Sequence, residues 1–239
     1  MIGCDCDVCR SDDPRDRRFR SSIYLECDDG QRVLVDTTTD LRSQALEHDI
    51  RQVDAILFTH SHADHVMGLD EVRRFRILGG QAMPVFGLPS TLTDIRRMFS
   101  YIFEPGLPPG AGVPHLRLWS LVGAFCLGRQ EVVPVPVRHG PWLVLGFRLG
   151  TFAYLTDCNA IPDTSMALLQ GVETLVLDAL RRRPHRTHFT LDQAVQVARQ
   201  VGAPRTYFTH IAHELGHAAV SAELPVGMAL AYDGLRLDC

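Results

Sequence analysis

The run of residues 59–65 is dense in side chains that bind metal ions, and it directly follows the apolar stretch 55–58. Its ligand-type residues are His60, His62, Asp64 and His65. Neutral imidazole nitrogens and carboxylate oxygens are the ligand atoms that suit zinc and harder divalent cations. Without an ion, side chains packed so closely would repel one another or lack partners. The run therefore indicates a metal site on the loop at the end of a strand, where α/β proteins commonly place their chemistry.

A second group of ligand-type residues lies near the start of the sequence, where Cys4, Cys6 and Cys9 fall within six residues. The chain has seven cysteines, which is an odd number. In a reducing compartment, such clustering indicates metal binding before disulfide bonding. Cys27, Cys126, Cys158 and Cys239 have no ligand-like spacing, so we expect them to pack, or in the case of Cys239 to be exposed at the chain end.

Length and composition fit one globular domain over residues 1–239, with 46% hydrophobic residues to build a core. The net charge of −4 argues against a protein whose main task is to grip nucleic acid or an anionic membrane. No stretch approaches the length of a membrane-spanning helix, and the N-terminus lacks the apolar core of a signal peptide. We therefore expect a cytoplasmic protein with neither membrane nor nucleic acid as a partner.

Strands and helices alternate along the sequence. Strands are expected at 23–25 and 32–35, which form a hairpin, at 55–58, 84–86, in the region 116–155, at 173–177, 205–209, Leu230 and Leu235. Helices are expected at 40–48, from 70, at 90–99 with Ser90 as the N-cap, at 163–169 and at 190–201. Residues 104–114, rich in proline and glycine, are expected to form an exposed loop. Two mixed sheets covered by helices satisfy this order better than one doubly wound sheet.

The pattern of the first cluster resembles the HxHxDH motif of the metallo-β-lactamase superfamily. The later markers of that superfamily follow in the expected order, with His139 after a strand, Asp157 in Leu-Thr-Asp and His210 in Phe-Thr-His. The resemblance implies an α/β fold, a four-layer αββα sandwich of two mixed β-sheets flanked by helices, with a dinuclear metal site at the sheet edge. It implies that one ion is held by His60, His62 and His139. It assigns the other ion to Asp64, His65 and His210, with Asp157 as the bridge.

Two ions bridged in this way lie about 3.5–4 Å apart and can clamp both the entering and the leaving oxygen of a phosphoryl displacement. Histidine-rich ligation admits zinc, manganese or iron, with availability deciding among them. Asp64 and Asp157 are therefore expected to be part of the catalytic centre. Asp36, at the end of the strand 32–35, resembles the superfamily aspartate that orients the metal loop.

Other segments resemble the PhnP-type branch of that superfamily, which includes the phosphoribosyl 1,2-cyclic phosphate phosphodiesterase of phosphonate breakdown. The resemblance implies a separate structural zinc bound by Cys4, Cys6, Cys9 and His213. Spacing alone leaves His217 open as the fourth ligand; we favour His213 on the resemblance and expect His217 on a helix surface. The Thr187-His188 segment implies that His188 lies beside the dinuclear centre as the general acid for the departing oxygen.

These residues predict a metal-dependent phosphodiesterase that hydrolyses a small cyclic phosphate, of phosphoribosyl 1,2-cyclic or nucleoside 2′,3′-cyclic type. A small phosphate ester is the expected partner, and the sequence is compatible with a homodimer. One alternative is a tRNA 3′-processing nuclease, which ranks lower because no long RNA-gripping arm or basic surface is evident. Others are a lactonase or thioesterase on the same ligands, or a non-catalytic carrier resembling proteins of quinone-cofactor biosynthesis that share the cysteine segment.

Proteins of this branch usually begin with a glycine-rich strand of the type Gly-x-Gly-x-Ser-x-Gly before the cysteine segment. The sequence runs from Met1 to Cys4 without it. An incorrectly assigned start codon or a truncation would explain this difference. If the strand is truly lost, a sheet edge is exposed and backbone near the site is removed, which would affect stability and activity but not the ligands.

Overall fold

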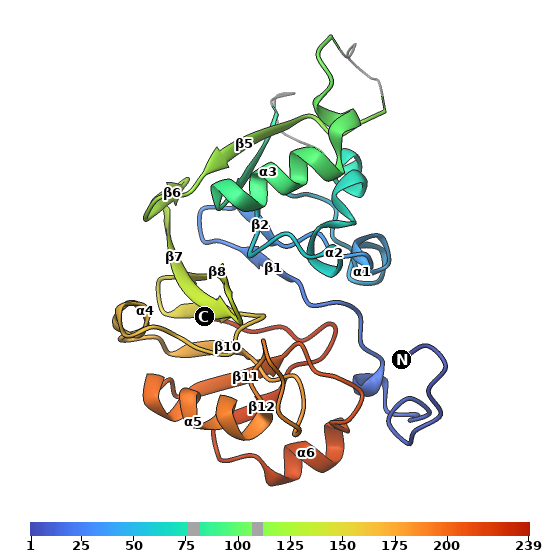
Figure 1. Ribbon diagram of the computed structural model, residues 1–239, viewed down its shortest axis with the longest axis vertical. Coiled ribbons are helices and arrows are strands. Elements are labelled where there is room, and N and C mark those ends of the chain that lie inside the picture. The colour runs from blue at the N-terminus through green and yellow to red at the C-terminus, as the bar shows by residue number, and fades with distance from the viewer. Residues whose placement is uncertain (76–81, 107–111) are drawn as a thin grey trace. The chain divides into compact units, whose positions relative to one another are not determined.

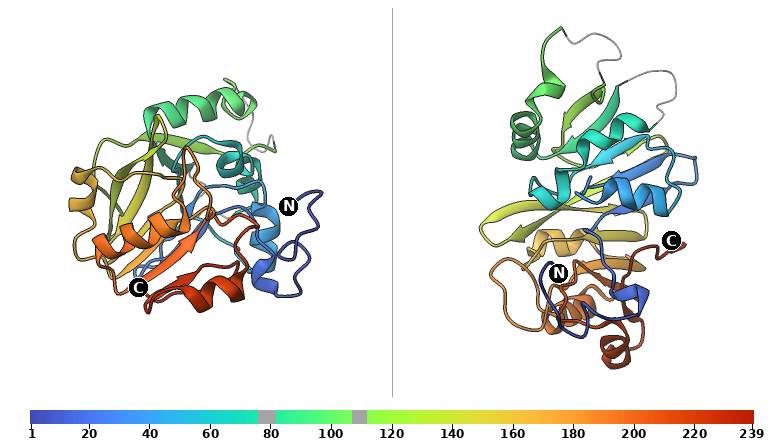
Figure 2. Two further views of the ribbon diagram at one scale, coloured as in Figure 1. Left: turned by 60° about the horizontal axis from the view of Figure 1, so that its bottom comes forward. Right: turned by 90° about the vertical axis from the view of Figure 1, so that its right-hand side faces the viewer.

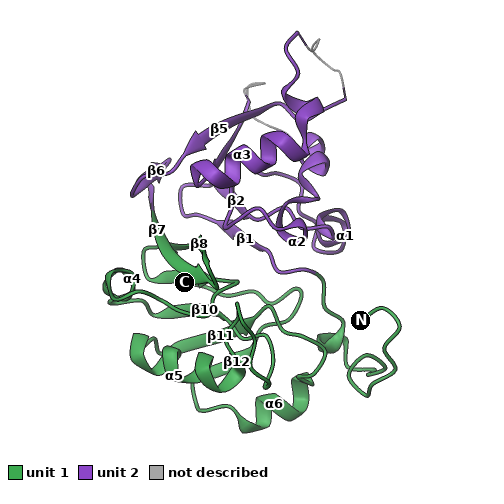
Figure 3. Ribbon diagram, in the orientation of Figure 1, with its two compact units in different colours: residues 1–19, 133–239 green, residues 20–132 purple. Residues whose placement is uncertain are grey.

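Short apolar runs form the strands of two mixed β-sheets, and helices pack against them (Figure 1). The computed structural model describes residues 1–75, 82–106 and 112–239. The chain divides into two compact units, which Figure 3 colours separately: unit 1 comprises Met1–Phe19 and Val133–Cys239, and unit 2 comprises Arg20–Val132. The predicted α/β class with two mixed sheets is confirmed. One domain over residues 1–239 stays a prediction.

Unit 2 contains a five-stranded sheet in the order β1-β2-β3-β4-β5. Its strands are β1 (Ile23–Glu26), β2 (Arg32–Val35), β3 (Ala55–Leu57), β4 (Met83–Gly87) and β5 (Leu116–Ser120). β1 and β2 form the predicted antiparallel hairpin, and the later pairs are parallel. Every residue of β3 is buried, as expected for a central parallel strand. The helices are α1 (Leu41–Glu47), α2 (Ala63–Val66) and α3 (Pro89–Met98), with 3-10 turns at Leu69–Arg74 and Ser100–Phe103.

Unit 1 contains most of a seven-stranded sheet in the order β12-β11-β10-β9-β8-β7-β6. Its strands are β12 (Met228–Leu230), β11 (Arg205–Thr209), β10 (Thr174–Asp178), β9 (Phe152–Leu155), β8 (Trp142–Leu149), β7 (Gln130–His139) and β6 (Phe125–Leu127). β7 begins in unit 2, where it pairs with β6, and continues into unit 1. The strands from β9 to β12 are parallel, whereas β7, β8 and β9 pair antiparallel.

Three helices accompany the sheet of unit 1: α4 (Asp163–Leu168), α5 (Leu191–Val201) and α6 (His217–Glu223). Figures 1 and 2 show α5 running beside the parallel strands, and its apolar face, including Ala194 and Ala198, is buried in the core there. A capping box starts α5, because the Thr190 and Gln193 side chains each bond to the other residue's backbone N–H. None of the helices within the described ranges has the length and apolar character needed to cross a bilayer.

Two local expectations were wrong. Helix α3 begins at Pro89 with Leu88 as its cap, not Ser90, because proline is preorganised for the first helical position and has no N–H to satisfy. Leu235 lies in a turn, where its N–H donates to the carbonyl of Tyr232 (3.1 Å), and not in a strand; β12 ends at Leu230. Of the expected loop at 104–114, residues 107–111 lie outside the described part of the chain.

Candidate metal centres

The histidine-rich loop of unit 2 follows strand β3 and leads into α2, with His62 as the helix N-cap. The rings of its three histidines form a close group: the centroid of His60 lies 4.5 Å from that of His62 and 4.3 Å from that of His65. Asp64 lies on the same short helix, and its Oδ2 is 3.9 Å from His65 Nε2 and 3.7 Å from the Arg20 guanidinium. Unit 2 thus gathers four of the seven ligands predicted for the dinuclear centre.

Asp36 fixes the direction of this loop from the end of the neighbouring strand β2. It is fully buried and has φ of +65°. Its carboxylate accepts hydrogen bonds from the Thr59 N–H (2.9 Å), the Thr59 hydroxyl (2.7 Å) and His65 Nδ1 (2.8 Å). Because Nδ1 of His65 is held in this way, Nε2 is the ring nitrogen presented as the metal ligand. Burial raises the pKa of Asp36, while the charge and hydrogen bond of His65 oppose that shift.

Gly68 lets the backbone after α2 approach the Thr37-Thr38 segment closely. The N–H of Gly68 donates to the Thr37 carbonyl (2.9 Å), and the N–H of Thr37 donates to the His65 carbonyl (2.8 Å). A Cβ at Gly68 would lie 2.0 Å from the Thr38 carbonyl oxygen. The close approach therefore requires glycine for space, and it ties the ligand loop to the segment that follows Asp36.

The second histidine group lies in unit 1, at the ends of the parallel strands. Asp157 follows β9 and His210 follows β11, both with left-handed backbone at φ of +51° and +57°. His210 Nε2 lies 3.3 Å from Asp157 Oδ1. The ligand atoms of Asp157, His210, Asp178 and His188 all lie within 4.8 Å of one another. The carboxyl ends of neighbouring parallel strands share one sheet edge, which is why residues so distant in sequence meet here.

His139 ends strand β7 and faces the same carboxylate. Its Nδ1 donates to the carbonyl of Thr187 (2.9 Å), so Nε2 carries the lone pair, and Nε2 lies 4.0 Å from Asp157 Oδ2. Unit 1 thus gathers the other three predicted dinuclear ligands. Of the seven predicted ligands in the two units, His62 is exposed and the others are buried or partly buried. Asp64 and His65 lie on α2, and the others lie at or shortly after the end of a strand.

Sequence reasoning missed Asp178, which ends β10 and is fully buried. Its Oδ1 bonds to His188 Nδ1 (3.0 Å), and its Oδ2 accepts from the Phe189 N–H (3.0 Å). Burial raises the pKa of Asp178, and its hydrogen bond with His188 opposes the shift. His188 Nε2 lies 3.8 Å from Asp157 Oδ2, so the predicted general acid does lie beside a predicted metal ligand. The available signal was a carboxylate directly after the apolar run 175–177, just as Asp36 directly follows the apolar run 33–35.

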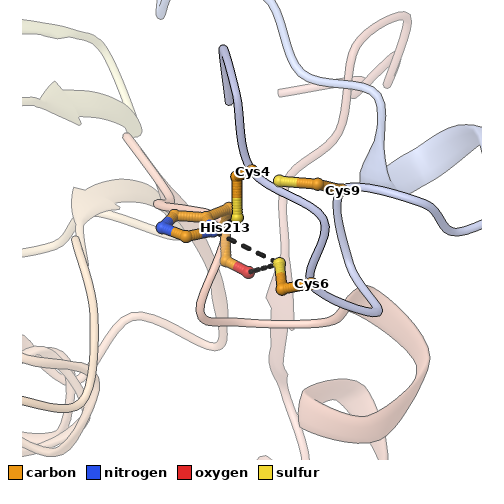
Figure 4. A group of neighbouring side chains, drawn as sticks. All are labelled: Cys4, Cys6, Cys9 and His213. Atoms are coloured by element: carbon orange, nitrogen blue, oxygen red, sulfur yellow. Dashed lines mark hydrogen bonds between the residues drawn. The ribbon is translucent and has the colours of Figure 1, made fainter.

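The cysteine segment forms a third group, shown in Figure 4. The Nδ1 atom of His213 lies 3.4 Å from Cys4 Sγ and 3.3 Å from Cys6 Sγ, and Cys9 completes a set whose ligand atoms lie within 4.8 Å of one another. A tetrahedral zinc with ordinary Zn–S and Zn–N bonds places its sulfur and nitrogen ligands about 3.6 Å apart, so the donors fit that ion. Hydrogen bonds from the Cys9 backbone and from His213 lower the pKa of Cys6 to about 6, which favours the thiolate that binds metal.

His217 is not part of this group. It was expected on a helix surface, and that expectation was wrong: it is the first residue of α6, only 4% exposed, with its ring packed edge-on against Tyr232. Burial lowers its pKa. Arg18 binds the segment around His213: its guanidinium donates hydrogen bonds to the carbonyls of Ala212 (3.0 Å) and Leu215 (2.5 Å). The N-terminal segment is thus fastened on both sides of His213.

The remaining cysteines are free thiols. Cys158 is buried and Cys239 is exposed, as expected, whereas Cys27 is only half-buried and Cys126, expected to pack, is exposed.

Comparison with known proteins gives one family and several relatives. The model of the beta-lactamase superfamily domain matches residues 31–211. A crystal structure of a diphosphatase from the PhnP family is 45% identical, covers 100% of this chain and 91% of its own, and superposes with a TM-score of 0.92. Zinc-bound PqqB from Methylobacterium extorquens shares the fold at 20% identity and a TM-score of 0.75, over 100% of this chain and 95% of its own.

A curated relative is named octanoyltransferase, from Porphyromonas gingivalis. It is 35% identical over 242 residues, which cover 98% of this chain and 48% of the relative. The chain therefore spans about half the length of that protein.

Proposed function

Because the chain belongs to the PhnP-type branch of the metallo-β-lactamase superfamily, we propose that it is a metal-dependent hydrolase that acts on a small phosphate ester. The observation that carries the proposal is the arrangement of the ligand residues within each unit. Buried or backbone acceptors hold Nδ1 of His65 and of His139, so each ring presents Nε2 for a cation.

We propose that the seven motif residues hold two divalent cations, and that Cys4, Cys6, Cys9 and His213 hold a structural zinc. When bound, the two cations would neutralise phosphoryl oxygens and lower the pKa of a water. The residues of this chain that orient the ligands are Asp36 and the Thr187 carbonyl. The identity of the cations, zinc, manganese or iron, is set by availability as well as by this donor set.

His188 is proposed to hand a proton to the departing oxygen. Its Nδ1 is held by Asp178, so Nε2 is the nitrogen on the side of Asp157. When its imidazole is protonated, His188 can donate from Nε2 as the P–O bond breaks. The buried Asp178 carboxylate also accepts a hydrogen bond from the Phe189 N–H, which restricts its rotation. It therefore holds the His188 ring in the position needed for this proton transfer.

We propose a cyclic phosphodiester as the substrate, because this proton donor matters most for a sugar alkoxide, which is a poor leaving group. A second candidate is hydrolysis of a diphosphate, favoured by the PhnP-family diphosphatase that is 45% identical to this chain. A departing phosphate is stable as an anion near neutral pH, since its second pKa is about 6, and it needs little help from an acid. The two candidates therefore differ in their dependence on His188.

The test compares H188A with wild type on both substrate classes, in manganese-loaded protein. For a cyclic phosphodiester such as adenosine 2′,3′-cyclic phosphate we expect kcat to fall by about 10²–10⁴-fold with metal content unchanged. The control is His115→Ala, an exposed histidine in unit 2 outside the motif, which should keep full activity. Full activity of H188A on the cyclic diester would exclude His188 from the mechanism.

The same assay decides among the other functions. Turnover of diphosphates alone would favour the second candidate. No turnover of either class, nor of bis(p-nitrophenyl) phosphate, by metal-loaded protein would favour the carrier or a lactonase or thioesterase. A cytoplasmic location, the absence of nucleic-acid and membrane partners, and a homodimer stay predictions.

A further inference from the structure

One large aromatic side chain is exposed next to the histidine group of unit 1. Trp142 begins β8 and is directly opposite His139 in the antiparallel register, so both side chains lie on the same face of the hairpin. The next pair on that face, Val137 and Val144, is buried at 0% and 2% exposure. Trp142 is 53% exposed. On this face, Trp142 is therefore exposed while His139 opposite it stays buried.

The turn that carries Trp142 is held in a fixed shape. Gly140 has φ of +61° and is followed by Pro141, whose ring fixes φ near −65°, a combination that fits a type II′ turn. The N–H of Gly140 donates to Asn159 Oδ1 (2.8 Å), and Asn159 Nδ2 donates to the Arg186 carbonyl (3.0 Å). A Cβ on Gly140 would lie 2.7 Å from Thr187 Cγ2, so the turn also packs closely against the segment before His188. The indole is thus held on a rigid support.

The indole of Trp142 lies close to His139, a predicted metal ligand, which in turn lies beside His188, the proposed proton donor. The ring centroids of Trp142 and His139 are 5.8 Å apart with an interplanar angle of 35°. His139 in turn lies edge-on to His188, at 4.7 Å between centroids. A ring attached to a phosphate ester that reaches His139 and His188 would lie within reach of the indole face. Aromatic platforms of this kind accept any base, because every base has a π-face.

We propose that Trp142 is a stacking platform for the planar ring of the substrate, and that the substrate class is phosphate esters bearing a nucleobase or a similar aromatic group. This inference rests on the proposed phosphate-ester function. Trp142 acts on specificity, by binding the ring that the phosphate carries, and takes no part in moving protons. It distinguishes nucleotide-like substrates from phosphates of bare sugars.

The first experiment measures binding without turnover. The chain has two tryptophans, so the W119F variant leaves Trp142 as the single tryptophan, whose emission can be excited selectively over that of tyrosine. Titration with adenosine 2′,3′-cyclic phosphate should quench its fluorescence saturably, whereas ribose 1,2-cyclic phosphate should not. Equal responses to both compounds, or no response to the adenosine compound, would overturn the proposal.

The second experiment measures selectivity, as the ratio of kcat/KM for the adenosine compound to kcat/KM for the base-free compound. In W142A this ratio should fall about tenfold to hundredfold, mostly through KM, and W142F should retain most of it. The control is L143A, because Leu143 is the adjacent exposed residue on the opposite face of β8, and its ratio should equal that of wild type.

The outcomes separate the two proposals. If W142A lowers kcat/KM for both compounds by the same factor, Trp142 is merely structural and the platform is refuted. If wild type hydrolyses neither compound, the proposed function fails, while the fluorescence titration still decides whether Trp142 binds a base.

Discussion

Replacing Gly68 by alanine tests how tightly the ligand loop of unit 2 is built. The added Cβ would lie 2.0 Å from the Thr38 carbonyl oxygen and 2.9 Å from Leu41 Cβ. The closer atom belongs to the backbone and cannot rotate away, so the two segments must separate. Overpacking of this kind costs about 1–3 kcal/mol. For a chain of this size, that lowers the melting temperature by about 2–12 °C.

The cost should arise from space alone, since the backbone at Gly68 has φ of −86°, which any residue adopts. The matched control is G123A, because Gly123 has no described atom within 4 Å of its would-be Cβ. Alanine there removes only the unfolded-state freedom of glycine and should stabilise by about 0.4–1 kcal/mol or change nothing. The difference between the two variants isolates the steric contribution.

The assay is thermal unfolding of both variants, combined with the metal content after dialysis. Gly68 is joined through Thr37 to the carbonyl of His65, so a displaced loop should also retain less metal. Equal melting temperatures for G68A and G123A, with equal metal content, would refute the reasoning that this approach constrains the ligand loop.

Two further predictions concern the metal groups. Replacing Cys6 by serine should remove one zinc per chain by elemental analysis and lower the melting temperature, because structural-zinc binding energy is folding energy; the exposed Cys126→Ser is its control, and equal zinc in both would contradict the structural site. Replacing Asp36 by asparagine takes away one of the two carboxylate oxygens that hold Thr59 and His65. We expect metal affinity at the histidine loop to drop about 10–100-fold in a competition titration; wild-type affinity would show that Asp36 does not orient His65.

The predicted ends of strands were the sequence feature that best located the residues of the candidate site. The apolar run before residue 59 places the histidine loop correctly after β3, and the carboxylate after Val35 proves to be the partner of that loop. Asp178 follows Leu177 in the same pattern but was not identified from the sequence. Its role depends on His188, ten residues further on, whose position no local rule supplies.

Long-range packing explains what sequence reasoning could not reach. His213 and His217 are separated in sequence by the spacing of one helical turn, and this spacing does not show which of them joins the cysteines. Tertiary contacts decide which histidine joins the cysteines. The cysteine segment and Arg18 hold the segment that carries His213, whereas His217 packs against Tyr232. The distant dinuclear ligands were assignable only through the family resemblance, because their positions depend on which strands become neighbours.

Unit 1 is built from both ends of the chain, so it cannot be complete until synthesis of the chain is nearly finished. Unit 2 is one continuous segment, whereas Cys4 emerges first and contacts His213, 209 residues later. At about 5–20 residues per second, roughly 10–40 s pass before that histidine exists. During this interval the thiols of Cys4, Cys6 and Cys9 have no histidine partner. In newly made chains they can therefore be oxidised or can bind another metal ion before His213 is present.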